Sequence, residues 1–273
     1  MSGPRPARRA ALIAAGTVLA VIALAAVAPG LLATHDPLLT DVRSTLQPPS
    51  AAHWFGTDQS GRDVYSRVVY GAGRSVGIGL LATALALVVG VVAGSLSAVA
   101  PRLVDAAAMR VVDVLLAFPE FLVALLVVAV LGPGAVNVAI AVTIAAVPVY
   151  VRLARAQTRS LAAAEHVEAA RLIGVPAAVV HVRHVLPGVL GAASVLATIG
   201  VGTSILAAAG LSFLGLGPTE PTAEWGLMLS AGRNLLLQAP WVALFPGLAI
   251  TATVVSVSVV GRILRARAEE RGA

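Results

Sequence analysis

The stretch EHVEAARLIGVPAAVVHVRHVLP, residues 165–187, is a polar insert between two long apolar runs. Together with the residues from 152 onward, it holds five arginines, two glutamates and three histidines. A charge at the centre of a bilayer costs about 2.5 to 3.5 kcal/mol on insertion scales. The insert is therefore expected to lie in water, between two segments that cross a membrane.

Within the insert, the residue pattern predicts two short helices joined by a sharp bend. The first part, SLAAAEHVEAARLIG over residues 160–174, is rich in good helix formers, and Glu168 can pair with Arg171 at three-residue spacing. Gly174 is a natural helix stop, and Pro176 suits the first turn of a second helix. That second helix is expected to end at Pro187. A bent pair of this kind favours a docking surface, although composition alone also allows a solvated linker.

The composition of the whole chain indicates a membrane protein. Of its 273 residues, 58% are hydrophobic and 12% are charged, more apolar surface than a soluble domain can bury. All 19 basic residues are arginine, so a Walker-type Gly-Lys-Ser/Thr nucleotide site is excluded. The arginines are scattered between apolar runs without an aromatic-rich basic face, which argues against nucleic acid. The absence of cysteine excludes disulfides and thiol chemistry.

Six stretches approach the length of about 20 apolar residues that a helix needs to cross a bilayer. They are 11–33, 76–100, 111–131, 135–151, 189–209 and 241–261. The first could instead be a secretory signal, but it is long for one, and Pro29 directly follows its small-residue triplet. The polar segment 34–74 should begin with turns and continue as a helix from about Asp58. We predict an all-α protein with six transmembrane helices.

The distribution of arginines predicts the orientation in the membrane. With the N-terminus inside, fourteen arginines fall on the cytoplasmic side and five on the other side. Basic residues accumulate in cytoplasmic loops. Both termini and the insert are therefore expected in the cytoplasm.

The insert resembles the EAA loop of ABC importer permeases, which reads EAA, three residues, Gly, nine residues and I-x-L-P. The residues that match this pattern are Glu168, Ala169, Ala170, Gly174, Leu186 and Pro187. His184 stands in place of the isoleucine, and His-Val-Leu-Pro is familiar in the branch that transports peptides. In this family the loop forms a coupling helix that inserts into a groove of the cytoplasmic ATPase.

Three further segments are similar to the second permease subunit of dipeptide, oligopeptide and nickel importers. They are residues 55–58 with 61–67, residues 113–119, and residues 211–217 with 224–226. Four motifs thus occur in the order of the family, from about residue 34 to the C-terminus. The resemblance implies a type I, MetI-like permease fold with cytoplasmic coupling helices, in the membrane of a bacterial cell.

The resemblance also implies the organisation and the partners. We expect an anchor span and extracytoplasmic loop in residues 1–70, the permease unit in 71–265 and a cytoplasmic tail in 266–273. The implied partners are a homologous second permease subunit, two ABC ATPase subunits, an extracytoplasmic binding protein and the lipid bilayer. ATP and Mg²⁺ would be bound by the ATPases, and no cofactor or metal is expected in this chain. Closure of the ATPases would move the segment 168–174 as a lever.

Glu120 is the candidate residue of a translocation path. It lies about midway along the predicted third span, where an ionisable group is costly and usually faces the bundle interior or water. It could meet the charged amino group of a peptide. The alternative is a structural glutamate that is protonated or paired with arginine. For the substrate, nickel is an alternative to peptide.

Two other classes of protein were weighed. A secondary transporter or channel typically shows inverted repeats and several intramembrane charges, whereas this chain has no evident repeat. A serine protease centred on Ser212 would need a histidine base, and no histidine follows His184. His35 and His53 lie in the outer loop near Asp36, but they lack a third fixed metal ligand.

Overall fold

The computed structural model describes the backbone of residues 5–272 and the side chains of residues 9–266. These residues form helices and one isolated β-bridge, between Thr57 and Asp63. The α-helices are α1 (Arg5–Val27), α2 (Val64–Val99), α3 (Arg102–Leu116), α4 (Glu120–Leu131), α5 (Ala135–Ala162), α6 (Glu165–Leu172), α7 (Ala177–Val180), α8 (Leu186–Phe213), α9 (Trp225–Gly232) and α10 (Trp241–Gly272). Shorter turns are the 3₁₀ segments Pro29–Leu31, Val42–Ser44 and Arg233–Leu235 and the π-helix His181–Val185. The all-α prediction is confirmed.

Five helical segments are long and apolar enough to cross a membrane, namely α1, α2, α5, α7 continued into α8, and α10. A sixth span exists only if α3 and α4 count together, and their axes differ by 95°. The prediction of one continuous third span over 111–131 is therefore wrong. Pro119 lacks a backbone N–H and disfavours helical geometry at Phe118, so the helix stops before it and restarts at Glu120.

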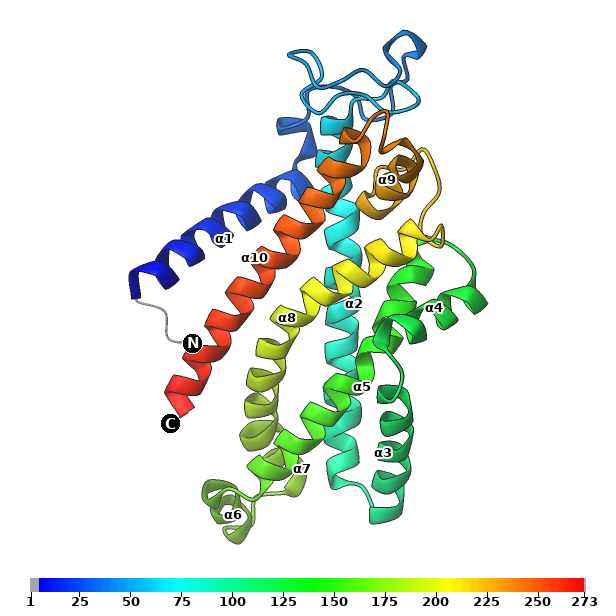
Figure 1. Cartoon of the computed structure of the whole chain (residues 1–273). Coiled ribbons are helices and arrows are strands. Elements are labelled where there is room, and N and C mark those ends of the chain that lie inside the picture. Colours follow the sequence, from blue (N-terminus) through cyan, green and yellow to red (C-terminus); the bar gives the residue numbers. More distant parts are fainter. Residues whose placement is uncertain (1–4, 273) are drawn as a thin grey trace.

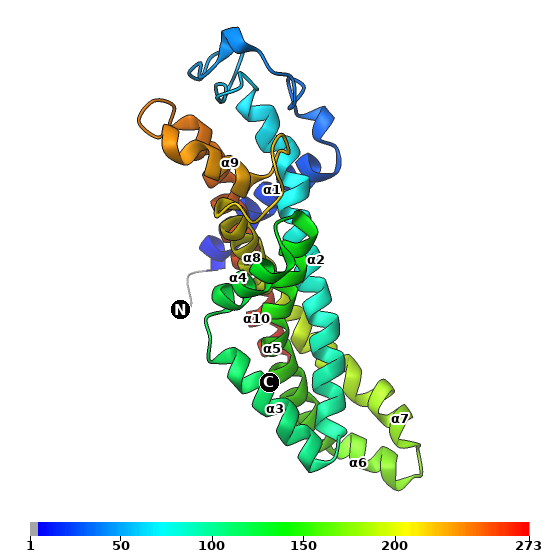
Figure 2. The same ribbon diagram turned by 90° about the vertical axis from the view of Figure 1, so that its right-hand side faces the viewer.

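Helix α2 is the central element, and Figures 1 and 2 show it running along most of the molecule. It packs most extensively against α5 and α8 and also contacts α1. Gly90 and Gly94 lie against α5, where an added Cβ would overlap Tyr150 and the backbone at Val151. The two glycines are in GxxxG spacing, which permits such close contact between helices.

The start of α2 differs from the prediction. The helix begins at Val64, because the Asp63 carboxylate caps it by accepting a 2.8 Å hydrogen bond from the Ser66 N–H. Asp58, the predicted start, instead closes a turn by accepting a 3.0 Å hydrogen bond from the Arg62 N–H. The predicted division of the chain at residue 70 lies inside α2, and this division stays a prediction.

The molecule has two structurally distinct ends, which Figures 1 and 2 both show far apart. The insert end contains α6, α7 and the corner between α2 and α3. The loop end contains the irregular segment 28–63 and α9. Helix α1 stops at Val27, short of its predicted end, and Pro29 then opens a 3₁₀ turn. Helix α10 extends beyond its predicted end at residue 261 and includes residues 266–272.

Candidate functional site

The first half of the insert is a short helix bounded by two breaks. The predicted helix over 160–174 is interrupted, because α5 ends at Ala162 and α6 begins at Glu165. Gly174 has φ +84° and open space around its Cα, which confirms it as a helix stop. Pro176 precedes α7 as its N-cap residue, one position earlier than predicted.

The second half of the insert continues directly into α8. The prediction that Pro187 ends this helix is wrong. The Leu186 N–H donates to the carbonyl of His181, five residues back, so the chain forms a π-turn instead of an α-turn. Pro187 then falls in the first turn of α8, where its missing N–H has no cost. The insert is therefore joined to α8 without a flexible break.

The six residues of the EAA-type pattern fall into two groups. Ala170 is only 8% exposed and packs in an apolar cluster with Val167, Val180 and the partly buried Leu186. The other four, Glu168, Ala169, Gly174 and Pro187, are exposed. The first group holds α6 against α5 and α8, and the second group is available to a partner.

The insert also has an exposed apolar tip that its sequence pattern alone did not lead us to predict. Leu172 and Ile173 close α6 and are each 82% exposed. The sequence did contain a sign of this tip, because two large apolar residues stand directly before Gly174, which ends the helix. Glu168 and Arg171 form no ion pair within the described side chains, contrary to prediction. They line a recess of about 580 Å³ that also touches Val99 of α2.

A carboxylate with two arginine partners lies next to this insert. Asp105 of α3 accepts hydrogen bonds from Arg155 Nη2 and Arg159 Nη2 of α5, each at 2.7 Å, and from Ser97 Oγ of α2 at 2.7 Å. Charge-assisted hydrogen bonds of this kind are stronger than neutral ones. The network fixes the end of α5, which carries α6, to the corner between α2 and α3.

Glu120 opens α4 at the break after Pro119, and so it does not lie midway along a straight span. It lines a cavity of about 190 Å³ together with Tyr150 of α5 and Thr203 and Ser204 of α8. No arginine lies within ion-pair distance of Glu120 in the described part of the chain, so the arginine-paired alternative has no support. The cavity combines one carboxylate with neutral hydroxyl groups.

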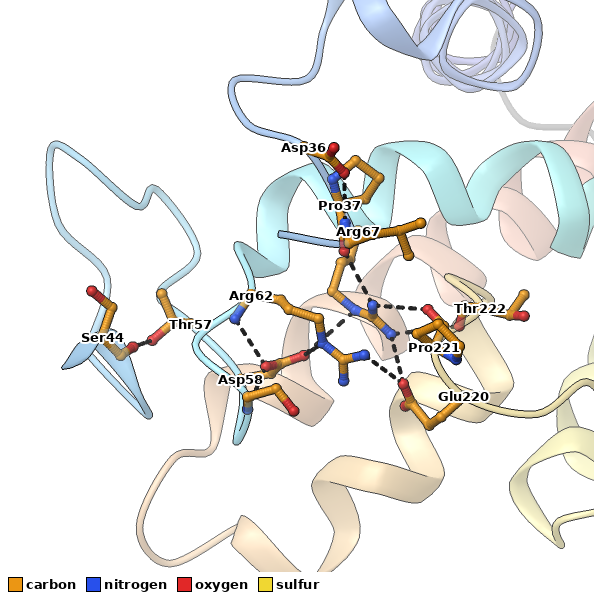
Figure 3. A network of polar contacts seen from close by, with 12 residues as sticks. Asp36, Pro37, Ser44, Thr57, Asp58, Arg62, Arg67, Glu220, Pro221 and Thr222 are labelled. Atoms are coloured by element: carbon orange, nitrogen blue, oxygen red, sulfur yellow. Dashed lines mark hydrogen bonds and ion pairs between the residues drawn. The ribbon is translucent and has the colours of Figure 1, made fainter. Parts of the chain in front are cut away.

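At the loop end, two arginines are clamped between two acidic residues (Figure 3). Arg62 binds Asp58 through Nε at 2.7 Å and Glu220 through Nη1 at 2.6 Å. Arg67 lies 3.5 Å from the same two carboxylates, and its side chain is 2% exposed. We call these four residues the arginine clamp. They connect the irregular segment 28–63 and the start of α2 to the segment before α9.

Further contacts of the clamp explain the residue types of the motif at residues 55–58 and 61–67. Arg67 Nη1 also donates to the carbonyls of Pro37 and Pro221, both at 3.2 Å. Burial alone lowers the pKa of Arg62, but its hydrogen bond to Glu220 and the charge of Asp58 leave that pKa above its ordinary value. Gly61 has φ +71°, and a Cβ there would overlap the backbone of Asp41.

The motif 224–226 has a similar structural explanation. Glu224 caps α9 by accepting from the N–H groups of Gly226 and Leu227, at 2.9 and 2.8 Å, and it also accepts from Ser75 Oγ. Gly226 packs closely against Ser212. The Oγ of Ser212 is buried without a hydrogen-bond partner among the described residues, so no base contacts it.

The fold and these sites define a multi-spanning α-helical membrane protein with a helical insert at one end and an ion-pair clamp at the other. Residues 86–271 match the family described as "Binding-protein-dependent transport system inner membrane component". The chain belongs to this family of transport proteins.

Relatives with established names agree with this assignment. The chain is 42% identical to the dipeptide transport system permease protein DppC of Alkalihalophilus pseudofirmus, over 86% of this chain and 80% of that protein. It is 42% identical to the probable D,D-dipeptide transport system permease protein DdpC of Escherichia coli K12, over 86% and 78%. It is 43% identical to the glutathione transport system permease protein GsiD of Salmonella paratyphi A, over 93% and 84%.

Proposed function

We propose that this chain is a permease subunit of an ATP-driven peptide importer and that its insert receives force from cytoplasmic ATPases. The observation that carries this proposal is the shape of the insert. Glu168, Ala169, Leu172 and Ile173 are exposed at the tip, while Val167 and Ala170 are buried below them. A linker needs no such apolar tip on a packed base, whereas a docking helix does.

The connections of the insert support a lever mechanism. Helix α5 leads into α6 through a two-residue break, and α8 leaves the insert through the continuous π-turn. The same two helices carry Tyr150, Thr203 and Ser204, which line the Glu120 cavity. A rigid movement of the insert would therefore displace two walls of that cavity, as alternating access requires.

The remaining parts of the transporter follow from this proposal. The insert end would face the cytoplasm with both termini, and the loop end would face an extracytoplasmic binding protein. A homologous permease subunit would complete the pathway. Two ATPase subunits would bind ATP and Mg²⁺, so this chain would itself carry out no catalysis.

Peptides are the substrate class that the cavity and the relatives favour. The relatives are named for dipeptides and for glutathione, which are small peptides with charged ends. Glu120 offers a carboxylate to a peptide amino group, and Thr203 and Ser204 offer hydroxyls. Nickel, the alternative, prefers imidazole nitrogen, and the cavity lining contains no histidine.

Glu120→Gln is expected to lower uptake of a labelled dipeptide about tenfold, because a charge-assisted hydrogen bond contributes about 1.5 to 3 kcal/mol. The measurement is the initial rate of uptake by cells that lack the native gene and carry either the wild-type or the Glu120→Gln form. Wild-type cells should take up the dipeptide and show no uptake of ⁶³Ni²⁺ above the gene-deleted cells.

Two controls make this test specific. Glu120→Asp keeps the charge and should retain most of the uptake. An amino-acetylated dipeptide has no charged amino group, so the Gln variant should transport it as well as wild type does. Equal uptake of the free dipeptide by the Gln variant and wild type would remove Glu120 from the path, and wild-type uptake of nickel instead of peptide would contradict the substrate class.

A further inference from the structure

Two histidines and one aspartate from three separate stretches of chain converge at the loop end. His35, His53 and Asp63 each place one potential metal-ligand atom within 4.8 Å of the other two. His53 Nδ1 lies 2.9 Å from Asp63 Oδ1, and His35 Nδ1 lies 3.9 Å from the same oxygen. The expectation that the two histidines lack a third ligand is therefore wrong, because the fold supplies Asp63. Asp36 instead accepts a hydrogen bond from the N–H of Leu38.

The two carboxylate oxygens of Asp63 have separate roles: Oδ2 caps α2, and Oδ1 forms a 2.9 Å hydrogen bond with His53 Nδ1, which a bound cation would replace. The Asp63 side chain is 1% exposed, and Oδ2 caps α2 by accepting from the Ser66 N–H. The other oxygen, Oδ1, points to the histidines. A cation could bind Oδ1 without disturbing the helix cap, because the two functions use different atoms.

The first histidine is also held in position by α2. Ser66 Oγ accepts hydrogen bonds from the N–H groups of Thr34 and His35, at 3.2 and 3.0 Å. The backbone of the loop is thus attached to the first turn of α2 beside the Asp63 cap. Thr34 Oγ1 lies 3.0 Å from His35 Nδ1, and a bound cation would replace this contact. Residues around metal ligands commonly fix the ligands in this manner.

We propose that His35, His53 and Asp63 bind one divalent cation of the zinc type, with water as a fourth ligand. Two imidazoles and a carboxylate are a typical zinc ligand set, with bonds of about 2.0 to 2.2 Å. Ligand atoms of a tetrahedral site are then about 3.4 Å apart. The widest separation, 4.8 Å, therefore needs to close by about 1.4 Å, and the 2.9 Å separation of His53 Nδ1 and Asp63 Oδ1 needs to open by about 0.5 Å. The side chains of His35 and His53 are 37% and 17% exposed, which gives a cation access from solvent.

The cation would tie the outer loop to α2 at a point next to the arginine clamp. In the sequence, His35 precedes and His53 follows the segment 41–47. This segment contacts Thr57 through the Gln47 N–H, and the backbone of Asp41 lies against Gly61. Hard cations such as Mg²⁺ prefer all-oxygen sites, so the site should discriminate against them. This inference does not depend on the proposed transport function.

The test uses the full-length chain with a histidine-free affinity tag in lipid nanodiscs, stripped with EDTA and titrated with ZnCl₂ by calorimetry. Wild type should bind one equivalent of Zn²⁺, and a large excess of Mg²⁺ should not compete. His53→Gln should weaken binding at least about tenfold, since even indirect support of a ligand contributes 10- to 100-fold. Asp63→Asn should do the same while keeping α2 capped, because Asn is an equally good N-cap.

His166→Gln and His181→Gln are the matched controls, because these histidines lie in the insert at the other end of the molecule. Both should bind Zn²⁺ as wild type does, and empty nanodiscs should bind none. Zn²⁺ should also protect His35 and His53, but not His166, from diethyl pyrocarbonate, read by mass spectrometry, which requires no variant to fold. Absence of stoichiometric binding, or equal binding by wild type and the Asp63→Asn variant, would overturn the proposal.

Discussion

Replacing both Leu172 and Ile173 by aspartate is expected to abolish ATP-driven uptake, with a fall of at least about 100-fold, while the protein stays folded. Each residue is 82% exposed, so the change removes little packing within this chain. Burying such a side chain against a partner contributes about 1.5 to 3 kcal/mol, and a carboxylate placed there adds a desolvation penalty. The measurements are uptake by proteoliposomes of the complete transporter and recovery of the ATPase subunits with the purified permease.

Leu237→Asp is the matched control for this variant. Leu237 is likewise a strongly exposed leucine, but it lies near α9 at the loop end, opposite the insert. This control should retain the ATPase subunits. A double variant that retains them and transports at the wild-type rate would show that the apolar tip is not the docking surface.

Arg67→Ala is expected to lower the free energy of unfolding by about 3 to 5 kcal/mol, the usual cost of removing one partner from a buried ion pair. The deletion leaves the buried Asp58 and the partly exposed Glu220 with one cation, Arg62, instead of two. Three backbone carbonyls also lose a donor. The measurement is the thermal unfolding midpoint of the purified protein in detergent, together with the amount of folded protein in the membrane.

Arg43→Ala serves as the control for the clamp. Arg43 is an exposed arginine of the same loop, and exposed positions usually change stability by no more than about 0.5 kcal/mol. The Arg67→Ala variant should therefore have a clearly lower thermal unfolding midpoint than the Arg43→Ala variant. Equal unfolding midpoints for both would mean that the clamp does not hold the loop end together.

The apolar runs and the arginine distribution were sufficient to predict an all-α membrane protein with a polar insert. Two prolines, however, had effects on the helices that differ from the prediction. Pro119 breaks a span that its apolar composition suggested was continuous, because an apolar segment can change direction without changing hydropathy. Pro187 was expected to end a helix, but the π-turn over His181–Val185 places it in the first turn of α8, and the helix continues. Hydropathy and helix propensity do not report such turns.

The candidate sites show a second limit of sequence reasoning. Ala169 and Ala170 are identical neighbours in one motif, yet only Ala170 is buried, because it shares with Val167 the face of α6 that packs in the cluster with Val180. Arg67 and Glu220 are 153 positions apart in the chain, so no local sequence pattern predicts that they pair. Motif residues could thus be recognised in advance, but their partners depend on how the helices pack.

The most direct test of the central claim is a crosslink between α6 and an ATPase subunit. The chain contains no cysteine, so single cysteines at positions 169 and 170 can be compared in the assembled transporter with a short bifunctional maleimide. Because Ala169 is exposed and Ala170 is 8% exposed, Ala169→Cys should crosslink to the ATPase and Ala170→Cys should not. If Ala169→Cys gives no crosslink in a complex shown to contain the ATPase, α6 is not the coupling element.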